Sequence, residues 1–257
     1  MKRTDEYRAR LRSLENWDPY LLAESGLPGP RANLELAQAA AEEGEEALFL
    51  RYVSAYPDTA APANSPEEFL AFCGIAGLGR LAAGGQRVHL PLLRLHASDP
   101  RWRIREAVAL AMQRLGEADM GALIVELESW SQGNPLEQRA AAAAICEPAL
   151  LRQPEHAQAA LRILDCITAS IEAMDDRRSG AFLALRKGLG YCWSVAAAAL
   201  PKAGKPAMEK WMQSGDRDIL WIMRENLKKN RLVKLDETWV ARWSARLGRW
   251  PEPFLRP

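Results

Sequence analysis

The sequence predicts an all-α fold, an α-solenoid in which pairs of helices stack one on another along the chain. Strong helix formers such as Ala, Leu, Arg, Glu and Gln dominate, and apolar residues recur three and four positions apart. Sustained period-two alternation is missing, and so are the Asn-Gly and Asp-Gly pairs that join two strands. Similar helix starts recur after 34 and 35 residues, a period typical of repeat proteins.

The composition indicates a soluble protein with a substantial core. The chain has 257 residues, of which 48% are hydrophobic. The longest apolar runs, Ala140–Cys146 and Val195–Leu200, are too short to cross a membrane, and the first residues lack the apolar region of a secretory signal. The four cysteines lie far apart with no C-x-x-C pair, which argues against a disulfide framework or a zinc ribbon. We therefore expect a cytoplasmic protein without a membrane partner.

The first 64 residues are expected to form an N-terminal helical cap that ends in a proline-rich connection. Apolar spacing predicts a helix over Glu35–Tyr56, and the prolines of Tyr56–Pro66 predict an irregular connection after it. Residues 65–250 are expected to form the helical repeats. Prolines argue against a helix in the tail, residues 251–257, which we expect on the surface.

Three helix starts in the repeat region share one design, a side-chain oxygen followed by proline. They are Ser65-Pro66, Asp99-Pro100 and Asn134-Pro135. An oxygen at the N-cap accepts from the free N–H groups of the first turn, and proline in the first helical position loses no helical hydrogen bond. The helices expected in this region run over Glu67–Ala83, Arg101–Leu115, Gly121–Trp130, Leu136–Cys146, Ala157–Ala173, Gly180–Leu200, Pro206–Met212, Asp218–Asn230 and Thr238–Leu247.

A second repeated pattern lies inside the helices. The motif Asp-x-x-Trp-x-x-Arg at residues 99–105 recurs at residues 218–224, and arginines at positions 139 and 186 fall between the two copies. A period of 34 to 47 residues in helical pairs indicates a solenoid of the HEAT or armadillo kind, a right-handed superhelix. Residues 98–115 resemble a HEAT repeat. The alternative is an unrepeated helical bundle in which the similar helix starts are coincidental.

The net charge of +1 conceals two opposed parts of the chain. Residues 1–176 hold 17 Lys and Arg against 26 Asp and Glu, a net of −9, whereas residues 177–257 hold 17 against 7, a net of +10. Such asymmetry points to a segment that binds a polyanion. The alternative is an ordinary solvated helix surface, charged on every face.

Signatures of familiar enzymes are missing. Nucleophile-elbow, P-loop, EF-hand and H-E-x-x-H patterns do not occur. The glycine cluster at positions 74, 77 and 79 follows no predicted strand, so a close helix–helix contact or a turn explains it better than a phosphate cradle. The three histidines form no pair at i, i+4. We expect neither a metal nor a cofactor.

Tryptophan and cations concentrate near the C-terminus. Six of the nine tryptophans lie between residues 193 and 250, inside the basic segment. Arg224, Lys228 and Arg231 are spaced i, i+4, i+7, which predicts three cations on one helical face. Such a face beside Trp221 suits phosphate contact, with stacking as a second contribution. The alternative is that each tryptophan fills the core between repeats.

One stretch resembles a known family. Leu185–Trp193 (LRKGLGYCW) resembles the R-K-x-[IL]-G-[WY] helix of the DNA alkylation repair family, and Pro206–Trp211 resembles the helix that follows it there. The family consists of HEAT-like alkylpurine DNA glycosylases whose solenoid cradles duplex DNA on a basic concave face. The resemblance implies that Arg186, Lys187 and Tyr191 lie on a DNA-binding surface.

The resemblance also implies a site for a damaged base. The family's acid and one of its aromatics lie four residues apart on a helix, as Glu106 and Trp102 do, and its arginine follows one repeat later, where Arg139 stands. The next aromatic would be Tyr191. An alkylated purine is cationic, so an aromatic face attracts it, and a carboxylate stabilises the oxocarbenium charge as the bond breaks. Glu106 replaces the usual Asp, and Tyr191 stands where Trp is commoner.

The leading hypothesis is therefore a HEAT-like solenoid that binds duplex DNA through a basic concave surface in its C-terminal part. Glycosylase activity, with Glu106 and Arg139 as catalytic residues, stays open beside the alternative that these two are surface or inter-repeat residues. The rival hypothesis is a protein–protein scaffold without enzymatic activity, since one fold hosts many functions. The residues expected to bind DNA are Trp102, Arg186, Lys187, Tyr191, Trp221, Arg224, Lys228 and Arg231.

Overall fold

A computed structural model describes residues 3–248, and all regular structure in that range is helical. The all-α prediction is therefore confirmed. The chain divides into two compact units, Met1–Leu123 and Ile124–Pro257, with the division inside α8 (Met120–Trp130). Among the described helices, none has the length and apolar character needed to cross a membrane. The expected tail, residues 251–257, lies outside the described residues.

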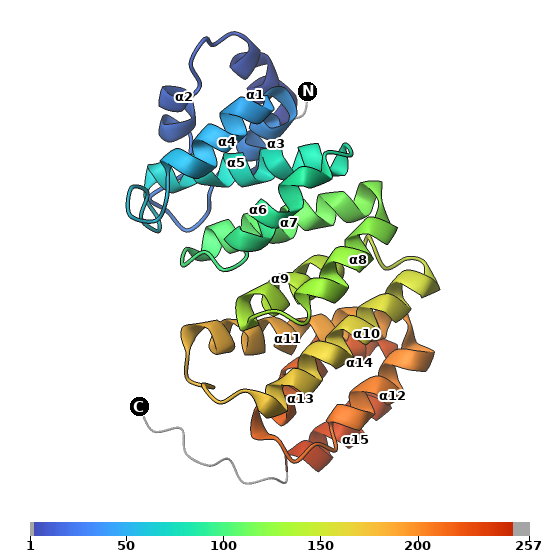
Figure 1. Cartoon of the computed structure of the whole chain (residues 1–257). Helices are drawn as coiled ribbons and strands as arrows, with labels where there is room; N and C mark the ends of the chain where they lie inside the picture. The colour runs from blue at the N-terminus through green and yellow to red at the C-terminus, as the bar shows by residue number, and fades with distance from the viewer. Residues whose placement is uncertain (1–2, 249–257) are drawn as a thin grey trace. The chain divides into compact units, whose positions relative to one another are not determined.

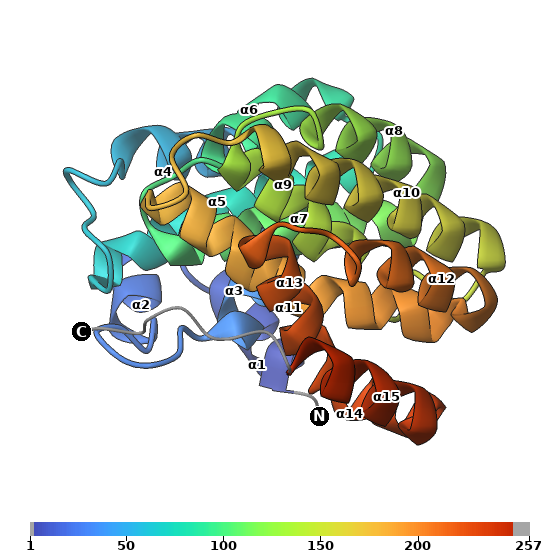
Figure 2. The same ribbon diagram turned by 90° about the horizontal axis from the view of Figure 1, so that it is seen from below.

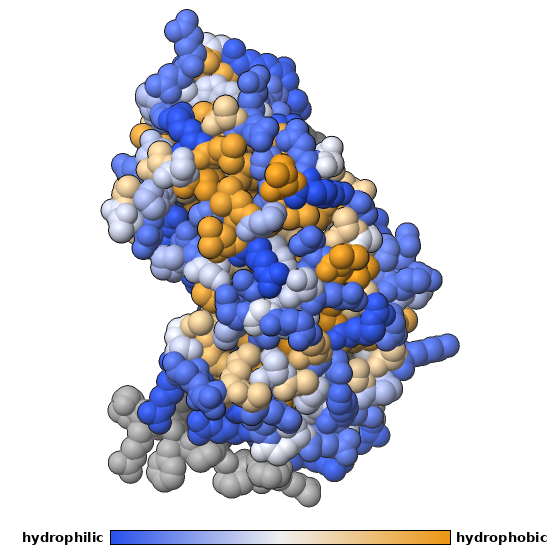
Figure 3. All heavy atoms as spheres, in the orientation of Figure 1, coloured by the Kyte–Doolittle hydropathy of each residue, from blue (hydrophilic) through white to orange (hydrophobic). Residues whose placement is uncertain are grey.

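The first unit is organised around α5, which packs against α2, α3, α4 and α7 (Figure 1). The odd-numbered helices pack against one another in chain order: α3 packs against both α1 and α5, and α5 packs against α7. Apolar side chains reach the surface over α4, where Leu50 is 38% exposed (Figure 3). The helices are α1 (Arg3–Arg12), α2 (Asp18–Ala23), α3 (Leu34–Glu43), α4 (Glu46–Ala55), α5 (Pro66–Ala83), α6 (Leu90–His96) and α7 (Trp102–Ala118), with a 3-10 turn at Arg87–His89.

The glycines of α5 make this close packing possible. A Cβ atom on Gly77 would lie 2.3 Å from the ring of Phe49 on α4, and one on Gly79 would lie 2.4 Å from the Cβ of Ala111 on α7. Any side chain at either position would push the neighbouring helix away. The glycine cluster is thus a device for helix packing, which confirms the interpretation favoured from the sequence.

The helix predicted over Glu35–Tyr56 is wrong as a single element. Gly44 has an extended backbone, with ψ at 166°, and separates α3 from α4. A Cβ on Gly44 would lie 2.6 Å from the ring of Phe49. The glycine allows the chain to turn at the point where that ring is buried, so two shorter helices cover α5 instead of one long helix.

Two of the three predicted helix starts are confirmed. The Ser65 hydroxyl accepts from the N–H of Glu68 at 3.3 Å, and the Asn134 side chain accepts from the N–H of Leu136 at 2.9 Å. Each oxygen satisfies a free donor of the first turn and so stabilises the start of its helix.

The third start, at Asp99, is wrong. α7 begins at Trp102, and the Asp99 carboxylate instead accepts from the backbone N–H of Arg101 at 2.8 Å and from its guanidinium at 2.9 Å. The same guanidinium donates to the carbonyl oxygens of Tyr56 and Ala61. Asp99 therefore orients a buried arginine that ties the proline-rich connection to the start of α7.

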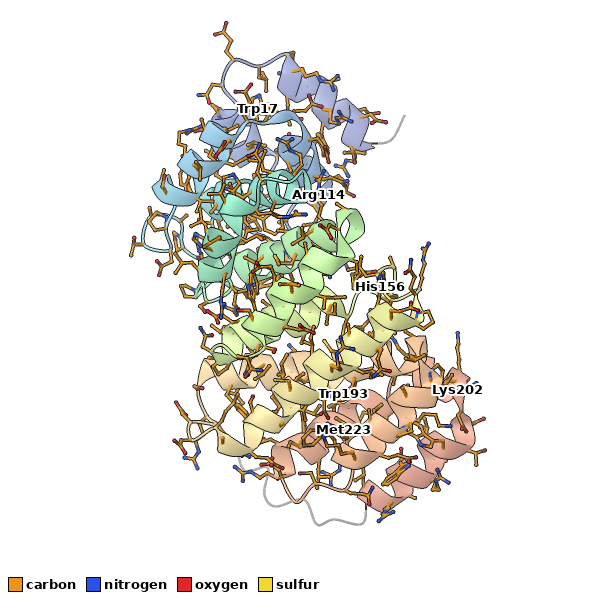
Figure 4. All side chains as sticks on the ribbon, turned by 45° about the vertical axis from the view of Figure 1, so that its right-hand side comes forward. Trp17, Arg114, His156, Trp193, Lys202 and Met223 are labelled. Carbon is orange, nitrogen blue, oxygen red and sulfur yellow. The ribbon has the colours of Figure 1, made fainter. Side chains whose placement is uncertain are left out.

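In the second unit, α11 packs against α9 and α13, and α13 packs against α15. α10 and α12 also pack against α11, and Figure 2 shows α11 and α13 next to each other. Trp193 and Met223 lie between the helices (Figure 4). The helices are α9 (Pro135–Ile145), α10 (Pro154–Ser170), α11 (Gly180–Ala199), α12 (Pro201–Trp211), α13 (Arg217–Leu227), α14 (Asn230–Leu235) and α15 (Glu237–Leu247), with a 3-10 turn at Ile171–Ala173.

Two predicted helices of this unit have different bounds. α12 begins at Pro201 rather than at Pro206, because Pro201 occupies the first turn, where proline is tolerated, and Pro206 lies inside the helix. The helix predicted over Asp218–Asn230 ends at Leu227, and a new helix begins at Asn230. The break between Leu227 and Asn230 changes the geometry of the candidate site.

Candidate nucleic-acid interface

One exposed stripe of α11 carries two of the predicted DNA-binding residues. Leu183, Lys187 and Tyr191 are spaced four apart and are exposed, whereas Leu185 and Leu189 between them are buried. The helical period places the three on the same side of α11. Tyr191 is 45% exposed, which is a large fraction for an aromatic side chain on a helix that packs against five others.

Arg186 and Trp221 connect this stripe to α13. The guanidinium carbon of Arg186 lies 4.5 Å from the centre of the Trp221 ring, and its Nη1 donates to a carboxylate oxygen of Asp218 at 2.6 Å. Gly190 allows α11 and α13 to pack closely here, since a Cβ on Gly190 would lie 3.3 Å from the Trp221 ring. Asp218 is buried and also lies 3.4 Å from a guanidinium nitrogen of Arg177. Arg186 is therefore held in place by both a ring and a carboxylate.

The predicted row of Arg224, Lys228 and Arg231 on one helical face is wrong. α13 ends at Leu227, so Lys228 stands at its C-terminal cap and Arg231 belongs to α14. The Nη2 of Arg224 donates to the carbonyl oxygen of Leu247 on α15 at 2.9 Å. Arg224 thus joins α13 to α15. Lys228 instead pairs with Glu225, and Arg231 lies against Tyr191.

A cluster of cations surrounds Tyr191. The guanidinium carbon of Arg231 lies 4.6 Å from the centre of the Tyr191 ring, and its Nη2 donates to the phenol oxygen. Lys229 Nζ lies 5.8 Å from the same ring centre. We call the open depression at this point the Tyr191 hollow. It has a volume of about 460 Å³ and is lined by Tyr191, Lys228, Lys229, Asn230, Arg231 and Lys234.

Most cations of the hollow have no carboxylate partner in the described part of the chain. Lys228 Nζ lies 2.5 Å from a carboxylate oxygen of Glu225. Among residues 3–248, Lys229, Arg231 and Lys234 form no ion pair. Lys229 and Lys234 were missed from the sequence, although the pair Lys228-Lys229 beside a helix end is a visible signal for a basic cluster.

A second hollow continues the first along the contact of α11 with α13. It shares Tyr191 and Lys229 with the Tyr191 hollow, and the rest of its lining consists of Leu183, Arg186, Lys187, Gly190, Trp221 and Glu225. We call the combined surface the basic face. Its basic and aromatic members are Arg186, Lys187, Tyr191, Trp221, Lys228, Lys229, Arg231 and Lys234, and it also includes the carboxylate of Glu225, which pairs with Lys228.

Elsewhere in the second unit, carboxylates neutralise several cations. Lys205 Nζ lies 2.6 Å from an oxygen of Asp236, and Lys210 Nζ lies 2.8 Å from one of Asp165. Both lysines belong to α12. The positive charge of the C-terminal segment is therefore unevenly distributed, and the basic face holds a larger uncompensated share than the side of the unit that carries these pairs.

The residues implied for a damaged-base site fall in both units. In the first unit, Trp102 starts α7 and is 49% exposed, the guanidinium carbon of Arg103 lies 4.5 Å from its ring centre, and Glu106 follows one turn later. In the second unit, Arg139 on α9 lies against α11, where a Cβ on Gly188 would be 3.4 Å from its Cγ.

Two further features bear on chemistry. No group of three or more His, Cys, Asp or Glu side chains within residues 3–248 is arranged to hold a metal ion. Cys146 and Cys192 are buried thiols, and burial together with the contact between them raises the pKa of Cys146 well above its ordinary value. A thiol held protonated in this way is a poor nucleophile.

The first unit has a groove of a different character between α3, α5 and α7. Its floor includes Phe72, and the exposed side chains of Leu34 and Leu110 stand at its edge. Arg114 Nη2 is paired with Glu42 at 2.5 Å, and Glu117 lies nearby in the same lining. The groove is therefore apolar to acidic, in contrast to the basic face.

No protein-family model, curated protein or solved structure matches this chain.

Proposed function

We propose that the second unit binds duplex DNA through the basic face. The observation that carries the proposal is the gathering of Lys229, Arg231 and Lys234, none paired with a carboxylate of the described chain, around the exposed ring of Tyr191. Phosphates supply much of the affinity of DNA-binding proteins, and lysine and arginine are their usual partners. Lys187 adds one more exposed cation a single helical turn from Tyr191.

The proposal includes HEAT-like repeats as the architecture, a right-handed superhelix of helical pairs. Its support is a set of contacts between neighbouring helices at a recurring sequence separation. Arg186 meets Asp218 across 32 residues, and Arg103 meets Glu68 across 35 residues. Both values are close to the 34 and 35 residues that separate the three proline-containing motifs. Stacked repeats offer extended surfaces, on which a duplex can lie.

Fluorescence anisotropy with a labelled duplex at several salt concentrations tests the binding. Counterion release predicts that affinity falls with salt, and each phosphate contact that is removed lowers the slope of log K against log salt by about 0.9. Lys187→Gln and Lys229→Gln are each expected to lower that slope. The matched control is Lys202→Gln, because Lys202 is exposed on α12 in the same unit and lies outside the basic face (Figure 4).

Two outcomes would count against this function. Anisotropy that stays flat at the lowest salt concentration would exclude DNA binding. Equal weakening by Lys187→Gln, Lys229→Gln and Lys202→Gln would show a diffuse attraction to the whole charged unit instead of a defined face.

Excision of an alkylated purine is a separate step that the family resemblance implies. Its proposed residues are Glu106, as the carboxylate that stabilises the oxocarbenium charge, and Trp102, whose ring would attract the cationic base. The exposed ring of Trp102, one turn from Glu106 on α7, supports this assignment. Binding to DNA does not depend on it.

A protein–protein scaffold is the second candidate, and the groove of the first unit is the observation that favours it. Leu34 is 52% exposed and Leu110 is 45% exposed at the edge of an apolar floor. Exposed leucines beside such a groove suit the apolar face of a partner helix. A partner whose binding is lost with Leu110→Gln but kept with Lys229→Gln would support this candidate.

A further inference from the structure

The Tyr191 hollow holds more positive charge than contact with a single backbone phosphate requires. Lys229, Arg231 and Lys234 line a single depression, and none of them forms an ion pair among residues 3–248. A backbone phosphodiester carries one negative charge, whereas a phosphomonoester carries about 1.5 to 2 at pH 7. Three cations in one hollow therefore match a terminal phosphate better than they match one backbone phosphate.

Neutral donors complete the lining. The phenol oxygen of Tyr191 accepts a hydrogen bond from Arg231 Nη2, so its own proton is available to a ligand. A hydroxyl that accepts from a cation is a stronger donor, because hydrogen bonds in a chain polarise one another. The exposed amide of Asn230 lines the same hollow and offers two further N–H groups.

We propose that the Tyr191 hollow binds a phosphomonoester, held by Lys229, Arg231 and Lys234 with a hydrogen bond from the Tyr191 hydroxyl. This inference deepens the proposed function and rests on it where the phosphate is the terminal phosphate of a DNA strand. A free phosphate or a nucleotide monophosphate has the same chemistry. Tyr191 and Lys229 also line the adjoining hollow, so a strand whose end is bound here continues over Trp221 and Lys187.

The test compares a duplex with 5′-phosphates, the same duplex with 5′-hydroxyls, and inorganic phosphate alone. The first two are compared by anisotropy, and the third by its effect on the backbone amide NMR shifts of the full chain. The 5′-phosphorylated duplex is expected to bind tighter by roughly tenfold, as charge-assisted hydrogen bonds to one added dianion would give. Inorganic phosphate is expected to shift the amides of residues 228–234 and to leave those of α12 unchanged.

Variants locate the effect. Lys234→Gln and Tyr191→Phe are expected to reduce the preference for the 5′-phosphate, because each removes one donor from the hollow. Lys187→Gln is expected to weaken both duplexes alike and keep the preference, since Lys187 lies outside the Tyr191 hollow. Lys202→Gln, remote on α12, should change neither.

The outcomes separate this inference from the proposed function. Equal affinity for the two duplexes, with no amide shift from inorganic phosphate, overturns the phosphomonoester site and leaves DNA binding standing. No binding of either duplex, with a phosphate shift that Lys234→Gln abolishes, overturns DNA binding and leaves the site as one for a free phosphate or nucleotide. A phosphate shift that persists in Lys234→Gln overturns the assignment to this hollow.

Discussion

Arg186 and Arg231 both lie against aromatic rings, but they differ in what else they contact. Arg186 is paired with the buried carboxylate of Asp218 at 2.6 Å, whereas within residues 3–248 Arg231 donates only to the neutral phenol of Tyr191. A cation paired with a neutral group has its charge uncompensated, so that charge is available to an anionic ligand. At the residue scale, Arg231 is therefore the better candidate for phosphate contact, and Arg186 mainly positions Trp221.

The role of Asp218 leads to a stability prediction. Asp218→Ala leaves Arg177 and Arg186 without their shared carboxylate, and because both arginines are partly exposed we expect a loss of about 1–3 kcal/mol in the free energy of unfolding. Urea unfolding followed by circular dichroism measures the loss. Asp175→Asn, an exposed carboxylate in the same unit, is the control and should stay within about 0.5 kcal/mol. A loss no larger than that of the control would contradict the packing role of Asp218.

Glu106 is the residue on which the excision hypothesis depends. If its carboxylate stabilises the oxocarbenium charge, Glu106→Gln is expected to lower the rate of base release from alkylated DNA by roughly 10²-fold or more while leaving duplex affinity nearly unchanged. Chromatography of the released free base measures the rate. The wild-type protein must release base above the spontaneous rate, and a wild-type rate equal to the background would reject the excision hypothesis.

At the scale of the elements, small residues determine how closely the helices approach one another. A Cβ on Gly204 of α12 would lie 2.4 Å from the Cα of Ala197 on α11. Gly180 at the start of α11 has nothing within 4 Å of the corresponding position. The two glycines belong to the same unit and therefore form a matched pair.

We predict opposite results for alanine at these two positions. Gly204→Ala forces α12 away from α11 and should cost about 1–3 kcal/mol, as overpacked cores do. Gly180→Ala should be neutral or stabilise by up to about 1 kcal/mol, because alanine favours the helix. Thermal unfolding of both variants measures the difference. Similar melting temperatures for the two variants would mean that α11 and α12 do not pack this closely.

The helices themselves were largely predictable, but their ends were less so. Ser65 and Asn134 cap their helices as the sequence predicts, because a cap depends on residues three apart. Asp99 fails the same rule because Arg101 competes for its carboxylate, and Arg101 is oriented by carbonyls some 40 residues away. The row of Arg224, Lys228 and Arg231 failed for a related reason, since local spacing does not reveal where α13 ends.

At the scale of the whole molecule, ion pairs make the first unit sensitive to acid. Hydrogen bonds from Arg12 and Arg8 lower the pKa of Glu43 from 4.5 to about 2, although partial burial opposes the shift. Burial would raise the pKa of Asp99, but hydrogen bonds from Arg101 and His96 hold it below its ordinary value. A carboxylate with a lowered folded-state pKa stabilises the fold above its unfolded-state pKa and loses that contribution as the pH falls through its folded value.

We therefore predict that the first unit loses stability between about pH 4.5 and pH 2. Chemical unfolding at a series of pH values, followed by circular dichroism, measures the loss. Glu43→Gln should lower stability at pH 7 and flatten the dependence in this range, because the variant has no carboxylate to protonate. A steep acid dependence that Glu43→Gln leaves unchanged would assign the effect to other groups.

The sequence alone determined the helical class and the charge contrast between the two ends of the chain. These properties follow from composition and from spacings within one or two helical turns. Only the tertiary structure decided which cations have no compensating carboxylate among residues 3–248. Arg224 turns to Leu247, Arg186 to Asp218 and Lys228 to Glu225, while Lys229, Arg231 and Lys234 gather at Tyr191, because the partners of most of these side chains come from other helices. The net charge of a segment counts its charged side chains, but the binding of an anion depends on where the cations without a carboxylate partner lie close together.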